Sequence, residues 1–150
     1  MKRPIVRKVL IALISIFLLM QFYRIDKTNP PIDASQDFMT VTKPPAPILN
    51  MIKGACYDCH SNESKYPWYT EVMPFSKWIQ GHIITGRKNM NFSTWASYSD
   101  EDKNHILKEC SEVLIETRMP LTPYLILHSE ARISKEERKE LADWFMALRK

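Results

Sequence analysis

The stretch "KGACYDCHSN", residues 53–62, decides how the rest of the chain is interpreted. Cys56 and Cys59 stand three positions apart, and His60 follows the second cysteine directly. This spacing is compatible with a redox dithiol, with half of a zinc site and with the attachment point of a covalently bound haem. The three interpretations require different folds and different partner residues, so the remaining sequence can choose among them.

The redox interpretation requires a fold that this sequence does not predict. In thioredoxin-type proteins the Cys-x-x-Cys pair lies at the start of a helix within an α/β fold. No segment of this chain alternates convincingly between apolar and polar residues, and 3 Gly against 10 Pro argue against tight hairpins. A dithiol also gives no reason for the histidine that follows.

The spacing of apolar residues predicts an all-α domain of about four helices joined by long loops. Ser99 precedes three acidic residues and is expected to cap one helix, and Ser134 with Glu137 is expected to form a capping box at another. The predicted helices lie within residues 47–60, 75–88, 99–117 and 134–148. A core this small, with so much loop, would be completed by a buried prosthetic group.

The N-terminus combines the basic cluster "MKRPIVRK", residues 1–8, with the apolar run Val9–Tyr23. This order is typical of a secretory signal or a signal anchor. No small-x-small cleavage site follows the run, so we expect residues 1–23 to form an uncleaved transmembrane helix. The positive-inside rule would then place the rest of the chain outside the cytoplasm.

The exported part divides into two segments by composition. Residues 24–46 are rich in proline and show little periodicity, which predicts an extended tether. Residues 47–150 hold the predicted helices and the cysteine motif, and we expect them to form the functional domain.

The net charge of +4 is located at the N-terminus. Four of the 21 Lys and Arg residues lie in the basic cluster, and the others are balanced by the 17 acidic residues. The domain therefore carries no basic excess, and we do not expect it to bind nucleic acid.

The zinc interpretation has a complete candidate set in Cys56, Cys59, His105 and Cys110, which would form a Cys3His structural site. However, Cys110 belongs to one apolar helical stripe with its neighbours, and a free cysteine in such a stripe behaves as a small hydrophobe. His105 falls off the centre of that stripe. A core cysteine and a half-exposed histidine explain these residues without a metal.

Covalent haem uses every residue of the motif. Each cysteine would form a thioether with one vinyl group, and His60 would lie under the ring and ligate the iron. Attachment of this kind takes place after export, which agrees with the N-terminal segment. One motif predicts one haem c, held by Cys56 and Cys59, and it leaves Cys110 as a buried thiol without a protein partner.

Three stretches of the chain resemble the bacterial haem-binding domain family. They are "CYDCHSNESKYPWY", "GRKNMNFSTW" and "MPLTPYLILHSEARISKEER", and the resemblance covers about residues 40–150. It implies a small, membrane-anchored protein with one c-type haem in a cytochrome c-like helical domain. The expected location is the bacterial inner membrane, single-pass, with the domain facing the periplasm. The resemblance does not imply a defined reaction.

Two residues compete for the sixth position on the iron. Met119 lies in "TRMPLTP", between a helix end and prolines that hold an extended loop, and Met-Pro resembles the distal ligand of monohaem cytochromes c. His82 shares an apolar stripe with Trp78 and Ile83, so its ring is expected to point inward. We expect Met119 to be the ligand, with His82 as the alternative, and an open position is the third possibility. His128 is expected to be a capping or surface histidine.

Electron transfer between a membrane donor and an envelope acceptor is the function we expect, through an unidentified redox partner protein. No sequence signature marks a catalytic acid or base, so a carrier is favoured over an enzyme. The alternative is a haem-dependent sensor or a peroxidase-like enzyme subunit.

Overall fold

The computed structural model describes residues 3–150, and within this range every regular element is a helix. The α-helices are α1 (Arg3–Met20), α2 (Phe38–Thr42), α3 (Ala46–Ala55), α4 (Tyr57–His60), α5 (Phe75–Asn89), α6 (Asp100–Ile115), α7 (Thr122–Leu127) and α8 (Lys135–Ala147). Three 3-10 helices join them: η1 (Trp68–Glu71), η2 (Phe92–Ser97) and η3 (Ser129–Ala131). The all-α prediction is confirmed. The four predicted helices correspond to α3, α5, α6 and α8, and the prediction missed the short helices α2 and α7.

Two of the predicted helix starts are confirmed in atomic detail. The Ser99 hydroxyl accepts the N–H of Asp102 at 3.0 Å, and the acidic residues of this turn face the positive end of the α6 dipole. At α8, the Ser134 hydroxyl accepts the N–H of Glu137 at 3.1 Å, and the N–H of Ser134 donates to the Glu137 carboxylate at 2.7 Å. Both signals are local, which is why the sequence alone revealed them.

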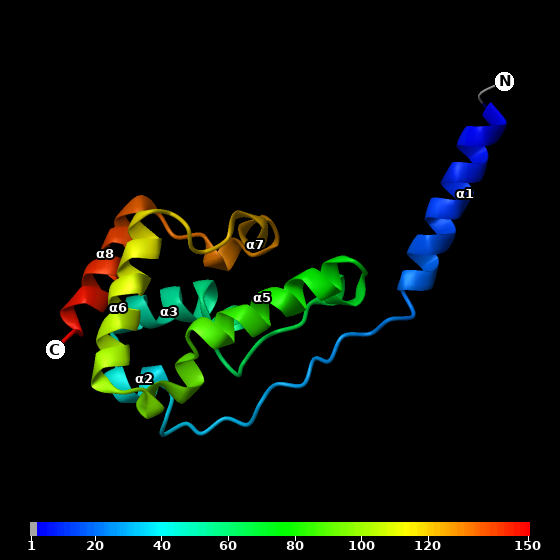
Figure 1. The fold of residues 1–150 in the computed structure, drawn as a ribbon. Coiled ribbons are helices and arrows are strands. Elements are labelled where there is room, and N and C mark those ends of the chain that lie inside the picture. Colours follow the sequence, from blue (N-terminus) through cyan, green and yellow to red (C-terminus); the bar gives the residue numbers. More distant parts are fainter. Residues whose placement is uncertain (1–2) are drawn as a thin grey trace.

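The apolar core lies on one side of the domain. Here α6 and α8 run side by side (Figure 1), and α2, α3 and η2 complete the layer beneath them. We call these five elements the packed half. Its largest fully buried side chains include Phe38, Phe92, Phe145, Ile52 and Leu141.

We call η1, α5 and α7 the open half of the domain. α5 packs against η1 and against α4, which carries part of the cysteine motif. Several large apolar side chains of these elements stay exposed, among them Trp68, Phe75, Trp78, Ile126 and Leu127. The apolar stripe predicted on α5 therefore borders open space as well as the core.

The segment predicted as a tether, residues 24–46, runs along the body of the domain (Figure 1). The Asn29 amide donates to the Ser64 carbonyl at 2.9 Å, and the Asn62 amide donates to the Pro31 carbonyl at 2.9 Å. Near its end the segment forms α2, whose Phe38 is 0% exposed at the centre of the core. The segment thus contributes to the packing of the domain.

The prediction of a membrane-spanning anchor is wrong. Within the described residues, no helix combines the length and the apolarity needed to cross a bilayer. α1 has 18 residues, about 27 Å of helix against an apolar bilayer core of about 30 Å. Arg7 and Lys8 lie inside the helix, so its uncharged run is shorter still. Met1 and Lys2 of the predicted anchor lie outside the described residues.

α1 projects from the body of the domain (Figure 1). Just after it, Gln21 forms a two-way amide contact with the backbone of Met73: the Met73 N–H donates to Gln21 Oε1 at 3.0 Å, and Gln21 Nε2 donates to the Met73 carbonyl at 3.3 Å. The chain that follows α1 therefore begins its path against the open half.

Candidate functional site

The cysteine motif lies where α3 gives way to α4. The N–H of Cys56 bonds to the Ile52 carbonyl at 3.0 Å and ends α3. The N–H groups of Cys59 and His60 then return to the Cys56 carbonyl, at 3.2 and 2.9 Å. One helical turn therefore holds both thiols and the imidazole in fixed relation, and all three cysteines of the chain are free.

The His60 ring is oriented by the chain that follows α5. Its Nδ1 lies 3.2 Å from the carbonyl oxygen of Met90, which can only accept, so Nδ1 carries the proton. Burial lowers the pKa of His60 and favours the neutral ring, although the Met90 carbonyl opposes the shift. Nε2 is left with a free lone pair, which is the form in which histidine binds a metal.

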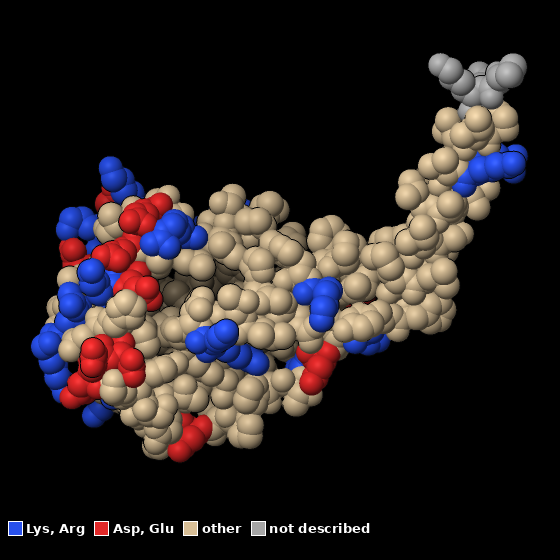
Figure 2. Space-filling view, viewed as in Figure 1, with Lys and Arg blue, Asp and Glu red and all other residues tan. Residues whose placement is uncertain are grey.

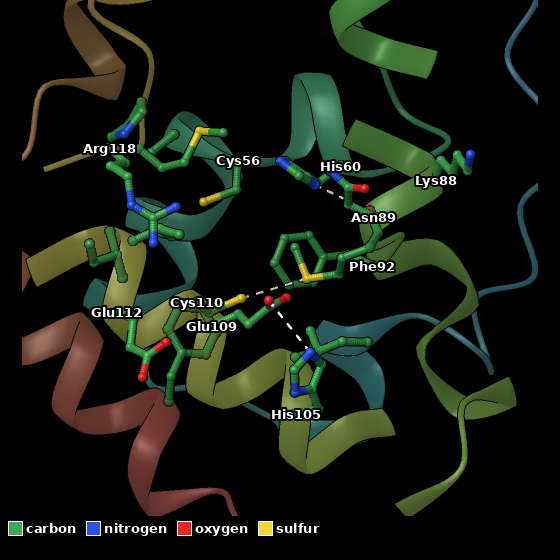
Figure 3. Close-up of a pocket in the computed structure, with 18 of the residues that line it drawn as sticks. Cys56, His60, Lys88, Asn89, Phe92, His105, Glu109, Cys110, Glu112 and Arg118 are labelled. Carbon is green, nitrogen blue, oxygen red and sulfur yellow. Dashed lines mark hydrogen bonds and ion pairs between the residues drawn. The ribbon is translucent and has the colours of Figure 1, made fainter. Parts of the chain in front are cut away.

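His60 opens into two adjoining cavities of about 730 and 290 Å³, which we call the central slot. The cavities share Ala55, His60, Asn89, Met119 and Pro120. Cys56 lines the larger cavity and Cys59 the smaller one, so the two thiols open into different parts of the slot. Figure 3 shows the larger cavity, with Cys56 and His60 on one side and Cys110 on the opposite wall, which α6 supplies.

The thiols of the motif are in their protonated form at neutral pH. Burial raises the pKa of Cys56 to about 12 and that of Cys59 to about 11, the latter with a contribution from the neighbouring Asp58 carboxylate. A reactive redox dithiol has a lowered thiol pKa, because the thiolate is the attacking species. The structure therefore agrees with setting aside the redox interpretation.

Both candidates for the sixth iron position reach the slot. Met119 lines both of its cavities, together with His60. His82 lines only the smaller cavity with His60, and its ring lies against Trp78 with 4.3 Å between centroids. The backbone of Met119 is held by an N–H bond to the Val113 carbonyl at 3.2 Å and by a bond from Arg138 to its own carbonyl.

The structure gives no support to the zinc alternative. His105 is an exposed residue of α6 at the edge of the larger cavity, and its ring pairs with Glu109 at 3.5 Å (Figure 3). Over residues 3–150 no group of three or more His, Cys, Asp or Glu side chains is placed to hold a metal ion. Cys110 is half-buried, and its Sγ lies 3.7 Å from the sulfur of Met90. Burial raises the pKa of this thiol as well.

Sequence reasoning missed two neighbouring residues that fix the motif against α5. A Cβ on Gly86 would lie 2.5 Å from the Cys59 carbonyl oxygen, so only glycine permits this approach. Arg87 donates to the Ser61 carbonyl at 2.7 Å, to Asn29 at 2.6 Å and to Ser64 at 2.9 Å. The glycine could have been noticed, because an isolated glycine inside a helical pattern often marks close packing.

A polar cluster on the far side of Cys59 was also missed. Tyr124 donates to the Asp58 carboxylate at 2.8 Å, and its ring stacks on His128 with centroids 3.9 Å apart. His128 is buried, with Nδ1 at 2.9 Å from Glu130 and Nε2 bonded to the Tyr69 hydroxyl. His128 does stand at the C-cap of α7, but the expectation of a surface position is wrong, because its ring is buried and bonded to Tyr69, 59 residues away in the chain.

A family model described as a haem-binding domain matches residues 15–147. The chain belongs to the haem-binding domain family. The match extends over the segment predicted as a tether and over the whole cysteine motif. No curated protein and no solved structure matches the chain.

The central slot of this haem-binding domain fits the group for which its family is described. It offers an imidazole with a free Nε2, two thiols and an apolar wall that includes Phe92, Leu114 and Phe145. When bound, haem would supply an iron centre that exchanges one electron. His60 would hold the iron, and the apolar part of the slot wall would cover part of the ring.

Proposed function

We propose that the protein carries one c-type haem and transfers electrons through it. Cys56 and Cys59 each add a sulfur and a hydrogen across one vinyl group, and His60 ligates the iron through Nε2. The observation that carries this proposal is the orientation of His60: its Nδ1 is bonded to the Met90 carbonyl at 3.2 Å, which leaves Nε2 free on a ring that lines one cavity with Cys56 and the adjoining cavity with Cys59.

Met119 is the sixth ligand in this proposal. Its support is position, because Met119 lines both cavities that His60 lines, whereas His82 lines one. A thioether held by a loop whose backbone is tied to α6 and α8 is suited to binding an iron without rearrangement. Methionine–histidine ligation also raises the reduction potential, as suits an electron carrier.

The proposed location is the cell envelope, with the domain in the periplasm. Attachment of c-type haem takes place after export, so a covalent haem requires the domain to leave the cytoplasm. The donor and the acceptor of the electron would be other redox proteins, which the slot does not specify.

Covalent attachment is tested by haem staining after denaturing electrophoresis. The full chain is expressed together with the c-type maturation machinery, and the wild type should retain one stained haem per chain. The Cys56→Ser, Cys59→Ser double variant should lose the stain completely, whereas Cys110→Ser, which alters a slot thiol outside the motif, should keep it. A wild type whose haem dissociates on denaturation would overturn covalent attachment.

The sixth ligand is tested on the same preparations by absorption of the ferric protein. The weak far-red sulfur-to-iron band should be present in the wild type and absent in Met119→Ala. Met146→Ala, on the exposed side of α8, is the matched control and should keep the band. If the band is missing from the wild type and His82→Ala makes the iron high-spin, His82 is the ligand instead.

A further inference from the structure

A separate large cavity lies in the open half, next to the central slot. This lateral cavity has a volume of about 920 Å³, within the range of small-molecule sites, and its lining is almost wholly apolar. Its walls come from η1, α5 and α7, and include the rings of Trp68, Phe75 and Trp78. Figure 2 shows charged side chains gathered over α6 and α8, whereas the surface over α7 is largely uncharged.

The lateral cavity adjoins the haem site. It shares Asp58, Cys59, His82, Leu121 and Tyr124 with the smaller cavity of the central slot. A molecule bound there would therefore lie beside the edge of the slot at which Cys59 opens. The lateral cavity has an exposed apolar rim that allows entry from solvent, and Ile126 on this rim is 69% exposed.

One corner of the lateral cavity is polar, and its hydrogen bonds have a defined direction. His128 Nδ1 faces the Glu130 carboxylate at 2.9 Å, so this nitrogen carries the proton. We assign to His128 the tautomer in which Nε2 is an acceptor, so that the Tyr69 hydroxyl donates to it. The hydrogen of Tyr69 is thus engaged, while its oxygen keeps a lone pair for a further donor.

The Tyr69 phenol remains protonated in this setting. Burial and the carboxylate of Asp58 raise the pKa of Tyr69 above its ordinary value. The corner therefore offers an acceptor oxygen at the edge of an aromatic-walled cavity.

We propose that the lateral cavity binds a planar, mostly apolar ring compound that carries an aromatic hydroxyl, of the phenol or hydroquinone class. The ring lies among the aromatic and aliphatic walls, and the hydroxyl donates to the oxygen of Tyr69. Aromatic walls suit a flat ring because offset and edge-to-face contacts add to the burial of its surface. Binding of this kind does not depend on the covalent haem.

The test uses 2-naphthol, which has two fused rings and one hydroxyl, titrated calorimetrically into the full haem-loaded chain. Saturable binding at one site is expected. The methyl ether, 2-methoxynaphthalene, cannot donate and should bind about tenfold more weakly, the equivalent of one hydrogen bond. In Tyr69→Phe the two probes should bind with equal affinity, because the acceptor oxygen is gone.

A charge at the rim gives a second, independent variant. Ile126→Glu should weaken binding of 2-naphthol by about tenfold or more, since a carboxylate would face the apolar ring. Ile115→Glu is the matched control: Ile115 is 57% exposed on α6, outside the lateral cavity, and its replacement should leave binding unchanged. Thermal unfolding of each variant verifies that it is folded.

Three results would overturn the inference: no saturable binding by the wild type, equal weakening in the two glutamate variants, or an undiminished preference for 2-naphthol in Tyr69→Phe. Haem staining of the same preparations separates this inference from the proposed function. A chain that holds covalent haem but does not bind 2-naphthol refutes only the lateral cavity site. A chain that binds 2-naphthol without covalent haem refutes only the haem proposal.

Discussion

The packed half and the open half of this domain differ in how far their aromatic residues are buried. In the packed half Phe38 contacts the rings of Phe92 and Trp95, with centroids 4.9 and 4.8 Å apart, and Trp95 is 3% exposed. In the open half Trp78 is 47% exposed, and it lines a cavity instead of filling one. The two tryptophans are chemically identical, so the difference lies in what the fold places around them.

This contrast indicates that the packed half stabilises the domain and that the open half provides its binding surfaces. Burial of large rings stabilises the packed half, because each buried aromatic removes a large apolar area from water. The open half leaves comparable area uncovered, at the junction where the cysteine motif, the central slot and the lateral cavity meet. We therefore expect substitutions in the packed half to change stability and those in the open half to change binding.

The largest effect is expected for Phe38→Ala. Phe38 is 0% exposed, and removal of a buried aromatic ring lowers the free energy of unfolding by about 3–5 kcal/mol. The exposed Val41, also on α2, is the matched control, and Val41→Ala should change stability by less than about 0.5 kcal/mol. Urea unfolding followed by circular dichroism measures both. Equal, small losses would show that α2 does not belong to the core.

Gly86→Ala should have the next largest effect, at the junction between the halves. The new Cβ would lie 2.5 Å from the Cys59 carbonyl oxygen, and the backbone shift that follows should cost about 1–3 kcal/mol. Gly81, on the same helix, has no atom within 4 Å of such a Cβ, so Gly81→Ala should gain about 0.5–1 kcal/mol. Two changes of the same sign would contradict the close packing of α5 against the motif.

A smaller effect is expected at the start of α8, on the outside of the packed half. Ser134→Ala removes the cap and should lower the free energy of unfolding by about 1 kcal/mol.

The capping carboxylate of Glu137 should make this stability depend on pH. The N–H of Ser134 lowers the pKa of Glu137 from 4.5, so the carboxylate stabilises the fold above that pH and loses the effect as the pH falls. Glu137→Gln should therefore destabilise the domain at neutral pH but not in acid. Thermal unfolding at both pH values tests this, and a pH-independent difference would contradict it.

The smallest effect on stability is expected for Trp78→Ala in the open half. Because Trp78 is half-exposed on the cavity wall, its truncation should lower the free energy of unfolding by less than about 0.5 kcal/mol. Trp95→Ala, in the packed half, should cost about 3–5 kcal/mol. Comparison of the urea midpoints of the two variants tests the difference between the halves. Similar losses of stability in both variants would contradict it.

The prediction of the fold from sequence succeeded where the signal was local. Apolar spacing located the four longer helices of residues 47–150, and the caps at Ser99 and Ser134 located two of their starts. The prediction failed for the N-terminal segment, which was expected to span a membrane. Basic residues lie inside α1 and shorten its uncharged run. The prediction also missed α2, because a five-residue helix carries too few turns for periodicity to show.

For the candidate site, the sequence by itself brought the residues of the cysteine motif together. Cys56, Cys59 and His60 lie within one helical turn, so their proximity follows from backbone geometry and needs no distant contact. The tertiary structure alone decided what surrounds them: the Met90 carbonyl that orients His60, the glycine that lets α5 approach, and the slot that Met119 enters. The same holds for the buried contact between His128 and Tyr69, which are 59 residues apart in the chain. Such contacts join residues far apart in the chain, and no pattern of neighbouring side chains specifies which of them meet.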